Sequence, residues 1–370
     1  MLIVRCAHIG DFVLWLDSAR AYREIYPGKR LIFLCPANKD VSDIARRTDY
    51  FDEVLVVFTG IKHRFKTVRM LMKTSYDTVI NTVTTRELKT DLFALAPRSF
   101  EYVAPETDLT LISRFWLKRS DSMYTKIIPS GSGMELLRNA RFVRGLGAVD
   151  FKAALPVIPE TAGWTSPASR YFAVCPGANR LEQRWEPEKF AAACDKLIEK
   201  SGLTCLILGS QNEQPAGEKL LNAAGLPGKY NYLIGKTRLS EYIEAIRRAA
   251  FILTCDTSAA HIAAAVRTPC VVLGAGWNMG RYYPYQTETT GDEQFFPFCV
   301  KAKLNCIGCG RDPGVTGKKK CLRGTVMKCV SGIETEDVLA ACLKLPEKRG
   351  FHAEQSNEKP AERAAPGMAP

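Results

Sequence analysis

The strongest constraint on the fold is an alternation of short, β-branched runs with longer helical patterns, which occurs twice along the chain. The first series predicts strands at 2–6, 30–35, 53–58 and 78–82, and helices at 11–26, 40–47 and 62–74. Such an alternation predicts parallel strands joined by crossover helices, which is a doubly wound α/β domain. Between about 100 and 150 the pattern is less regular and more basic, and it predicts a single helix at 134–146.

A second series follows a Pro-, Ser- and Thr-rich stretch at 156–169, which is typical of a linker. It predicts strands at 171–175, 204–208, 232–234, 251–255 and 270–273, and helices at 187–201, 213–224, 239–249 and 258–266. The chain is therefore expected to form two Rossmann-like domains, at 1–157 and 171–345, joined by a linker at 158–170. The polar, Pro- and Ala-rich end at 346–370 is expected to be disordered.

Charge and cysteine content narrow the class of partner and compartment. The 370 residues include 51 Lys and Arg against 39 Asp and Glu, a net charge of +12. This excess favours an anionic partner, which is a nucleic acid, a phosphorylated metabolite or an acidic membrane surface. No apolar run reaches the length of about 18–20 residues that spans a bilayer, and the first residues do not form a secretion signal. The 13 cysteines, several of them within strand-like runs, favour free thiols in a reducing cytoplasm.

The first motif with chemical content is His8-Ile9-Gly10-Asp11, between the first strand and the first helix. One interpretation is that Asp11 is an N-cap carboxylate. The other is that Asp11 lies at the carboxyl edge of the sheet, where a catalytic base or a ligand anchor is expected. The motif lacks the Gly-x-Gly-x-x-Gly pattern, so it does not favour a dinucleotide-dependent dehydrogenase.

Three further motifs lie in the second series. In Cys175-Pro-Gly-Ala-Asn179, followed by Gln183-Arg-Trp-Glu-Pro187, Gly177 and Arg184 are candidates for holding a phosphate. Asp256, Thr257 and Ser258 begin a helix rich in small residues, and His261 lies one turn further on, a pattern typical of an anion site. Glu213 follows a strand, where a carboxylate can accept hydrogen bonds from ribose hydroxyls. Each motif also has an ordinary structural interpretation. The first would be a plain strand-to-helix connection, Asp256–Ser258 would be an N-cap, His261 would be a packed core histidine, and Glu213 would be a solvated acid in the first turn of a helix.

Taken in order, these segments resemble glycosyltransferase family 9, the ADP-heptose:lipopolysaccharide heptosyltransferases and their relatives. The resemblance covers about 1–345 and includes the early Ile-Gly-Asp, Tyr76-Asp-Thr-Val-Ile80, Pro-Gly-Ala with Arg-Trp-x-Pro, Gly-x-x-x-Glu, the segment 233–241 and Asp-Thr-x-x-x-His. It implies the GT-B fold, in which two Rossmann-like parallel-sheet domains face each other across a cleft. The first domain would bind the acceptor and the second the nucleotide sugar.

The resemblance also implies roles for individual residues. Asp11 would be the catalytic base of an inverting transfer, and Asp256, Thr257, Ser258 and His261 would lie at the donor diphosphate. Glu213 would lie near the ribose and Arg238 near the nucleobase. The family works without a metal ion or other cofactor, and the chain contains no Asp-x-Asp motif. Gln183 stands where the family usually has Lys or Arg, which leaves Arg184 or Arg180 as the cation at the phosphates.

The implied activity is transfer of a heptose, or a similar sugar, from an ADP-sugar to a lipopolysaccharide-core or other lipid-linked acceptor. The enzyme would be cytoplasmic, with peripheral contact at the inner membrane surface. The basic segment 62–73 would bind anionic lipid or the phosphates of the acceptor. The alternative is that this segment is only a solvated helix face. The alternatives are a UDP- or GDP-sugar donor for another surface glycan, and an inactive homologue.

A cluster of cysteines raises a different possibility. Cys306 and Cys309 form a Cys-x-x-Cys pair, and Cys321 and Cys329 follow at a spacing that is imperfect for a zinc knot. These thiols are expected to be buried or incidental, with a structural metal or iron–sulfur site as the alternative. A basic zinc protein that binds nucleic acid is thus a rival hypothesis. The diffuse charge and the lack of a nucleic-acid-binding motif speak against it.

Overall fold

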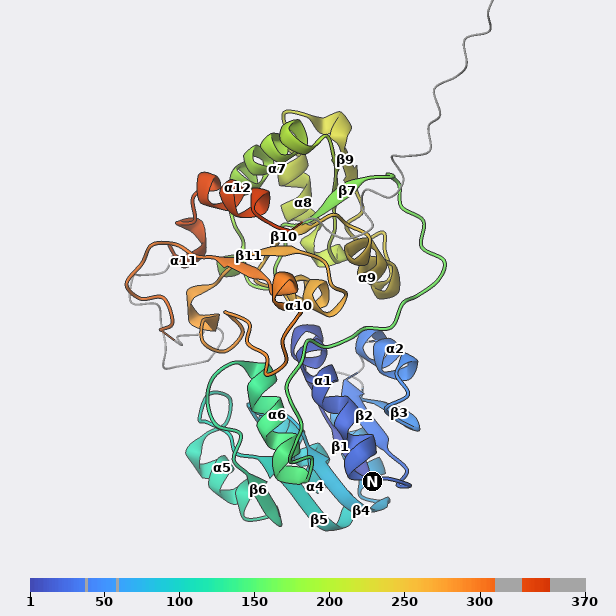
Figure 1. The fold of residues 1–370 in the computed structure, drawn as a ribbon. Coiled ribbons are helices and arrows are strands. Elements are labelled where there is room, and N and C mark those ends of the chain that lie inside the picture. The colour runs from blue at the N-terminus through green and yellow to red at the C-terminus, as the bar shows by residue number, and fades with distance from the viewer. Residues whose placement is uncertain (37–38, 58–59, 310–327, 347–370) are drawn as a thin grey trace, which may run out of the picture.

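The computed structural model describes residues 1–36, 39–57, 60–309 and 328–346. The described chain forms two lobes stacked one above the other, each built on a six-stranded parallel sheet with helices on both faces (Figure 1). The α/β class predicted from the two alternating series is therefore confirmed. No helix in the described parts of the chain is both long enough and apolar enough to cross a membrane.

The N-terminal lobe has the strand order β3-β2-β1-β4-β5-β6. Its elements are β1 (Leu2–Val4), α1 (Ile9–Ile25), β2 (Ile32–Pro36), α2 (Lys39–Arg47), β3 (Glu53–Val57), α3 (Ile61–Leu71), β4 (Ser75–Asn81), α4 (Leu88–Leu95), β5 (Arg98–Pro105), α5 (Arg114–Asp121), β6 (Lys126–Ile128) and α6 (Glu135–Leu146). Right-handed crossovers place α1 and α2 on one face and α3, α4 and α5 on the other. Helix α6 packs beside α1.

The C-terminal lobe has the strand order β12-β11-β10-β7-β8-β9. Its main elements are β7 (Tyr171–Cys175), α7 (Pro187–Ser201), β8 (Thr204–Ile207), α8 (Gln214–Ala223), β9 (Tyr230–Tyr232), α9 (Leu239–Arg247), β10 (Ile252–Cys255), α10 (Ser258–Ala265), β11 (Cys270–Leu273), β12 (Phe298–Val300), α11 (Lys328–Ser331) and α12 (Thr335–Leu343). Short 3₁₀ turns lie at Leu181–Gln183, Gln211–Glu213, Pro227–Lys229, Gly276–Asn278 and Glu293–Phe295. All neighbouring strands in both sheets are parallel, so their carboxyl ends meet at one edge of each sheet.

Helices α1 and α10 join the two lobes into one apolar core. Seven of the eight residues of α10 are buried, and most of these are alanines. Small side chains allow close approach of another helix, and α1 packs directly against α10. A Cβ atom at Gly10 would lie 2.9 Å from Cδ2 of His261 and 3.5 Å from the Cα of Ser258. The first turn of α1 therefore requires glycine at this point of contact.

Candidate functional site

Asp11 lies in the first turn of α1, after the carboxyl end of β1, and contacts the opposite lobe. Tyr282 donates a hydrogen bond from Oη to Asp11 Oδ1 at 2.8 Å, and Arg281 Nη2 lies 3.9 Å from the same oxygen. The Asp11 side chain is 22% exposed, so it remains accessible to a ligand. The N-cap residue of α1 is His8, so the interpretation of Asp11 as the N-cap is wrong. Its carboxylate instead accepts a hydrogen bond from Tyr282, which is 271 positions away in the sequence.

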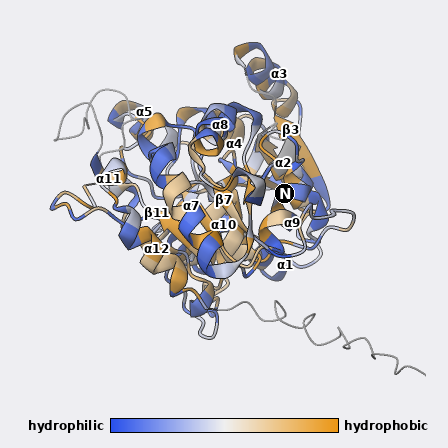
Figure 2. Cartoon of the chain, turned by 90° about the horizontal axis from the view of Figure 1, so that it is seen from above, coloured by the Kyte–Doolittle hydropathy of each residue, from blue (hydrophilic) through white to orange (hydrophobic). Residues whose placement is uncertain are grey.

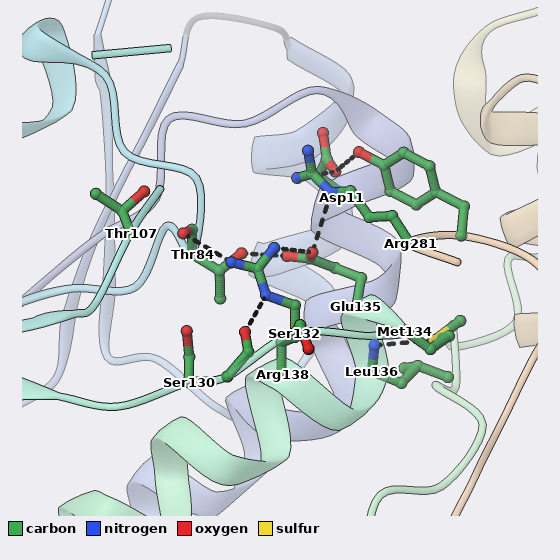
Figure 3. Close-up of polar contacts among 12 residues, drawn as sticks. Asp11, Thr84, Thr107, Ser130, Ser132, Met134, Glu135, Leu136, Arg138 and Arg281 are labelled. Carbon is green, nitrogen blue, oxygen red and sulfur yellow. Dashed lines mark hydrogen bonds and ion pairs between the residues drawn. The ribbon is translucent and has the colours of Figure 1, made fainter. Parts of the chain in front are cut away.

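A second carboxylate, Glu135 at the start of α6, is buried beside Asp11 and was not predicted from the sequence. It forms ion pairs with Arg281 and Arg138 at 3.3 Å each and with Arg5 at 4.0 Å, and it accepts a hydrogen bond from the hydroxyl of Thr84 (Figure 3). Burial raises the pKa of Glu135, but the three guanidinium groups outweigh it and lower the pKa to about 2. Glu135 is therefore a fixed negative charge at neutral pH.

Arg281 links the lobes at this point through both its side chain and its backbone. Its side chain lies between Asp11 and Glu135, and its carbonyl accepts a 2.8 Å hydrogen bond from the backbone N–H of Glu135. Its guanidinium also packs over the ring of Tyr282 at 4.9 Å from the centroid. Burial lowers the pKa of Arg281, but the neighbouring carboxylates raise it overall, so the side chain stays charged.

His261, on α10, is buried at the junction with α1. Its Nδ1 lies 2.6 Å from the Oη of Tyr285, and its ring stacks on Tyr283 with an interplanar angle of 10°. Burial lowers the pKa of His261 to about 4, so the imidazole is neutral at pH 7. The structure thus brings His261 and Ser258 against Gly10, one residue from Asp11.

The Asp256–Ser258 turn has a different internal arrangement from a simple anion site. Asp256 is buried and accepts hydrogen bonds from Asn278 Nδ2 at 2.8 Å and from the N–H of Ala275 at 3.2 Å. Burial raises the pKa of Asp256 to about 6. Thr257 caps α10, with its hydroxyl accepting from Ala259 N, and Ser258 is the first residue of the helix. Asp256 therefore fixes the turn, while Thr257 and Ser258 lie at the helix N-terminus.

Glu213 and Gly177 are in direct contact, although they lie on different loops. A Cβ atom at Gly177 would come within 2.5 Å of the Glu213 side chain, so only glycine fits there. Glu213 Oε2 accepts hydrogen bonds from the backbone N–H and the hydroxyl of Ser210 at 2.6 and 2.8 Å. This places Glu213 at the carboxyl ends of β7 and β8, where the sequence analysis expected a ribose ligand.

The expected cations occupy less central positions. Arg184 donates from Nε to the carbonyl of Ala178 at 2.9 Å, and Gln183 donates to the carbonyl of Asp256 at 3.1 Å. The first bond lies within the 176–186 loop, and the second holds this loop against the segment before α10. Arg238 is 81% exposed and pairs with Glu241 at 2.8 Å, at the start of α9. It lines a surface cavity with Arg47 and Trp164, among others, and does not join the group around Asp11.

The cysteines of the last third of the chain do not form a metal-binding group in the described residues. The thiol of Cys299 donates to the sulfur of Met279 at 3.7 Å, and Cys329 packs near Gly276. Cys306 is half-buried and Cys309 is exposed. Cys321 lies outside the described residues.

Comparisons with known proteins agree with this architecture. A family model for glycosyltransferase family 9 (heptosyltransferase) matches residues 151–293. Lipooligosaccharide heptosyltransferase 2 of Haemophilus influenzae is 34% identical over 104 residues, an alignment that covers 27% of this chain and 29% of that protein. Lipopolysaccharide heptosyltransferase 3 of Escherichia coli K12 is 23% identical over 282 residues, which cover 71% of this chain and 79% of that protein.

Solved structures share the fold over almost the whole chain. A family 9 glycosyl transferase from Veillonella parvula superposes with a TM-score of 0.70 at 17% identity, covering 93% of this chain and 96% of that one. ADP-heptose lipopolysaccharide heptosyltransferase II of E. coli gives a TM-score of 0.66 at 18% identity, covering 93% and 97%. The two facing parallel-sheet lobes therefore have the GT-B fold, as predicted. The match to the model of glycosyltransferase family 9 over 151–293, together with the heptosyltransferase relatives, supports the family resemblance inferred from the sequence.

Proposed function

We propose that this protein transfers a heptose, or a similar sugar, from an ADP-sugar to a lipopolysaccharide-core or other lipid-linked acceptor, with inversion at the anomeric carbon. The observation that supports this most directly is the position of Asp11 next to the first turn of α10, across the contact between the lobes. The names of the relatives, which are heptosyltransferases of lipopolysaccharide and lipooligosaccharide, support the choice of sugar and acceptor.

In the proposed reaction, Asp11 acts as general base. It takes the proton of an acceptor hydroxyl while that oxygen forms a bond to the anomeric carbon of the donor. The bond from this carbon to the diphosphate oxygen breaks, and the electron pair leaves with the nucleoside diphosphate. Tyr282 engages Asp11 Oδ1, which leaves Oδ2 for the acceptor hydroxyl. Tyr282 thereby fixes the orientation of the carboxylate.

The leaving diphosphate would be held by groups of the C-terminal lobe. The N-terminus of α10, with the hydroxyls of Thr257 and Ser258, would offer hydrogen-bond donors and the positive end of the helix dipole. Arg184 would add a positive charge from the adjacent loop, and Gly177 allows the backbone to approach. Glu213 would accept hydrogen bonds from the ribose. In this proposal His261 packs at the site as a neutral ring, and Arg238 reaches the nucleobase by its exposed side chain.

A thermal-stability panel with ADP, UDP, GDP and their sugars tests the donor. We expect ADP compounds to stabilise the protein most, because binding to the folded state alone raises the melting temperature. A clear preference for UDP or GDP would contradict the choice of donor and favour the alternative of another surface glycan.

The variant Asp11→Asn tests the base. It should lose turnover by at least about a hundredfold, since general-base catalysis contributes roughly 10²–10⁴. It should keep the stabilisation by ADP, because Asp11 lies in the opposite lobe from the proposed nucleotide site. Full activity of this variant would contradict the assignment of Asp11 as the general base. If the wild-type protein binds the donor but shows no transfer activity, the protein is an inactive homologue.

The proposed enzyme works in the cytoplasm, where the lipid-linked acceptor brings it into peripheral contact with the inner membrane surface. The match of 151–293 to the model of glycosyltransferase family 9 speaks against the rival hypothesis of a zinc protein that binds nucleic acid. That hypothesis predicts retention on DNA at physiological salt without any response to nucleotide sugars. The proposed enzyme should show the opposite behaviour in the same two measurements.

A further inference from the structure

Exposed apolar side chains are concentrated on one helical layer of the N-terminal lobe. Of sixteen large hydrophobic side chains exposed among the described residues, ten lie on α3, α4, α5 or the chain next to α5. They are Ile61, Phe65, Met70, Met72, Leu92, Leu109, Leu111, Phe115, Trp116 and Met123. We call this set, with the three helices that carry it, the outer layer. Single exposed apolar residues are normal, but such a concentration marks an interaction surface.

The outer layer covers the sheet face opposite to α1. Its inner side is an ordinary core, in which Leu71 and Phe93 pack on Val79 of the sheet. Figure 2 shows α3 projecting from the body, and α5 near the same edge of the molecule. On α3, Ile61, Phe65 and Met72 are spaced so that they fall on one face of the helix. Phe65 is 71% exposed and Phe115 on α5 is 68% exposed, so these rings meet solvent.

Basic side chains surround these apolar ones. Segment 60–75 contains no acidic residue. Helices α3 and α5 carry exposed basic side chains, and one more lies just after α3, at Lys73. The full set is Lys62, Arg64, Lys66, Arg69, Lys73, Arg114, Lys118 and Arg119. A helix with basic residues beside aromatic and aliphatic ones binds the interface of an anionic bilayer, where the charges meet lipid phosphates and the apolar groups enter the acyl boundary. A nucleic acid would offer no place for the aliphatic side chains.

The outer layer is also placed suitably relative to Asp11. Helices α3 and α5 follow the parallel strands β3 and β5, so both begin at the carboxyl edge of the sheet. Asp11 lies at this same edge, after β1. A bilayer held against the start of these helices would therefore bring a lipid-anchored sugar acceptor to the edge where Asp11 lies.

We propose that the outer layer is the membrane-docking surface of the protein, binding anionic phospholipid through its basic residues and inserting Phe65, Phe115 and Trp116 into the interface. This inference rests on the proposed function for its purpose, which is access to a lipid-linked acceptor. The binding itself does not depend on catalysis.

Flotation of the full chain with vesicles tests the proposal. We expect binding to phosphatidylglycerol–phosphatidylethanolamine vesicles, at least tenfold weaker binding to phosphatidylcholine, and a decline as salt is raised. Each neutralised Lys or Arg should weaken binding about fivefold, so the triple variant Lys62→Gln, Lys66→Gln, Arg69→Gln should weaken it by about a hundredfold. The triple variant Phe65→Ser, Phe115→Ser, Trp116→Ser should have a similar effect, and all these side chains are exposed, so the variants should fold.

The matched control is Val149→Ser with Phe298→Ser, which removes two exposed apolar side chains outside the outer layer (72% and 56% exposed). It should bind vesicles as the wild type does. Equal binding to neutral vesicles, equal loss in the control, or no loss in both triple variants would overturn the proposal. Tighter binding to DNA than to vesicles, unaffected by the serine variants, would also overturn it and indicate a nucleic-acid surface.

Transfer to a delipidated, soluble acceptor separates this inference from the proposed function. Transfer without vesicle binding would refute the docking surface alone. Vesicle binding without transfer to either acceptor would refute the proposed function alone. We expect both triple variants to keep activity on the soluble acceptor and to lose it on acceptor embedded in vesicles.

Discussion

Replacing Glu135 with Gln should destabilise the protein by about 3 kcal/mol at pH 7. The folded structure lowers the pKa of this carboxyl from 4.5 to about 2. Each unit of pKa shift corresponds to about 1.4 kcal/mol of stabilisation, and the side chain is only 1% exposed, so solvent screening is weak. The substitution also leaves Arg5 and Arg138 buried without their counter-charge, and breaking a buried pair in this way costs roughly 3–5 kcal/mol.

The sign of the pH dependence follows from the direction of the shift. Because the pKa of Glu135 is lower in the folded state, its contribution is complete above pH 4.5 and is lost as the pH falls through 2. Urea unfolding of the wild type and of Glu135→Gln should therefore differ by about 3 kcal/mol at pH 7 and by about half of that at pH 3. A difference that is equal at both pH values would refute the electrostatic argument.

The exposed pair of Glu53 with Arg30 provides a matched control. Its N···O distance is 2.8 Å, which is shorter than the contacts of Glu135, but the two side chains are 39% and 70% exposed. Glu53→Gln should cost less than about 1 kcal/mol, because solvent screens exposed pairs. If Glu135→Gln costs no more than this control, burial is not the source of its stabilisation. In a double-mutant cycle with Arg281→Gln, the two substitutions should cost less together than the sum of each alone.

Three further predictions concern the candidate site. Tyr282→Phe should lower kcat about tenfold, because Asp11 loses the hydrogen bond that fixes its orientation. Tyr230→Phe, which removes a 2.8 Å bond to Asp195, should leave kcat unchanged. Gly10→Ala should reduce the free energy of unfolding by roughly 1–3 kcal/mol through overlap with His261, whereas Gly228→Ala, which meets open space, should not. Burial raises the pKa of Asp256 from 3.8 to about 6, so the stability that its protonated form provides is lost as the pH rises through 6. The free energy of unfolding in urea should therefore be higher for Asp256→Asn than for the wild type by up to about 3 kcal/mol at pH 8, and equal at pH 3. An unchanged kcat in Tyr282→Phe, an equal loss in both glycine variants, or a less stable Asp256→Asn at pH 8 would contradict the respective argument.

The regular parts of the fold were predictable because their hydrophobic patterns are strong. Buried strands such as Tyr171–Cys175 and Cys270–Leu273 form at their predicted residues. The segment from 98 to 128 was not predicted, although it contains β5, α5 and β6. Strand β5 alternates exposed and half-buried residues over its first half, and α5 carries exposed aromatic and basic side chains in place of an apolar face. Both features remove the periodicity on which prediction from sequence depends.

The candidate site also contains residues that could be predicted from the sequence and residues that could not. Motifs at strand ends indicated Asp11, Gly177, Glu213 and the Asp256–His261 segment, because parallel strands collect such residues at one edge. Nothing local in the sequence indicated Arg281 or Tyr282, whose partners lie in the other lobe. The direct contact of Glu213 with Gly177 likewise depends on two loops that only the folded sheet brings together.

The surroundings of the two neighbouring carboxylates explain why Asp11 and not Glu135 suits the role of base. Both approach Arg281, but Glu135 is buried and also pairs with Arg138 and Arg5, so its pKa of about 2 makes it a poor proton acceptor. Asp11 is 22% exposed, and one of its oxygens is held by Tyr282. Two adjacent acids with such different environments take different roles. Glu135 holds Arg281, and Arg281 and Tyr282 contact one oxygen of Asp11. In the proposed reaction this arrangement leaves Asp11 accessible to the acceptor hydroxyl.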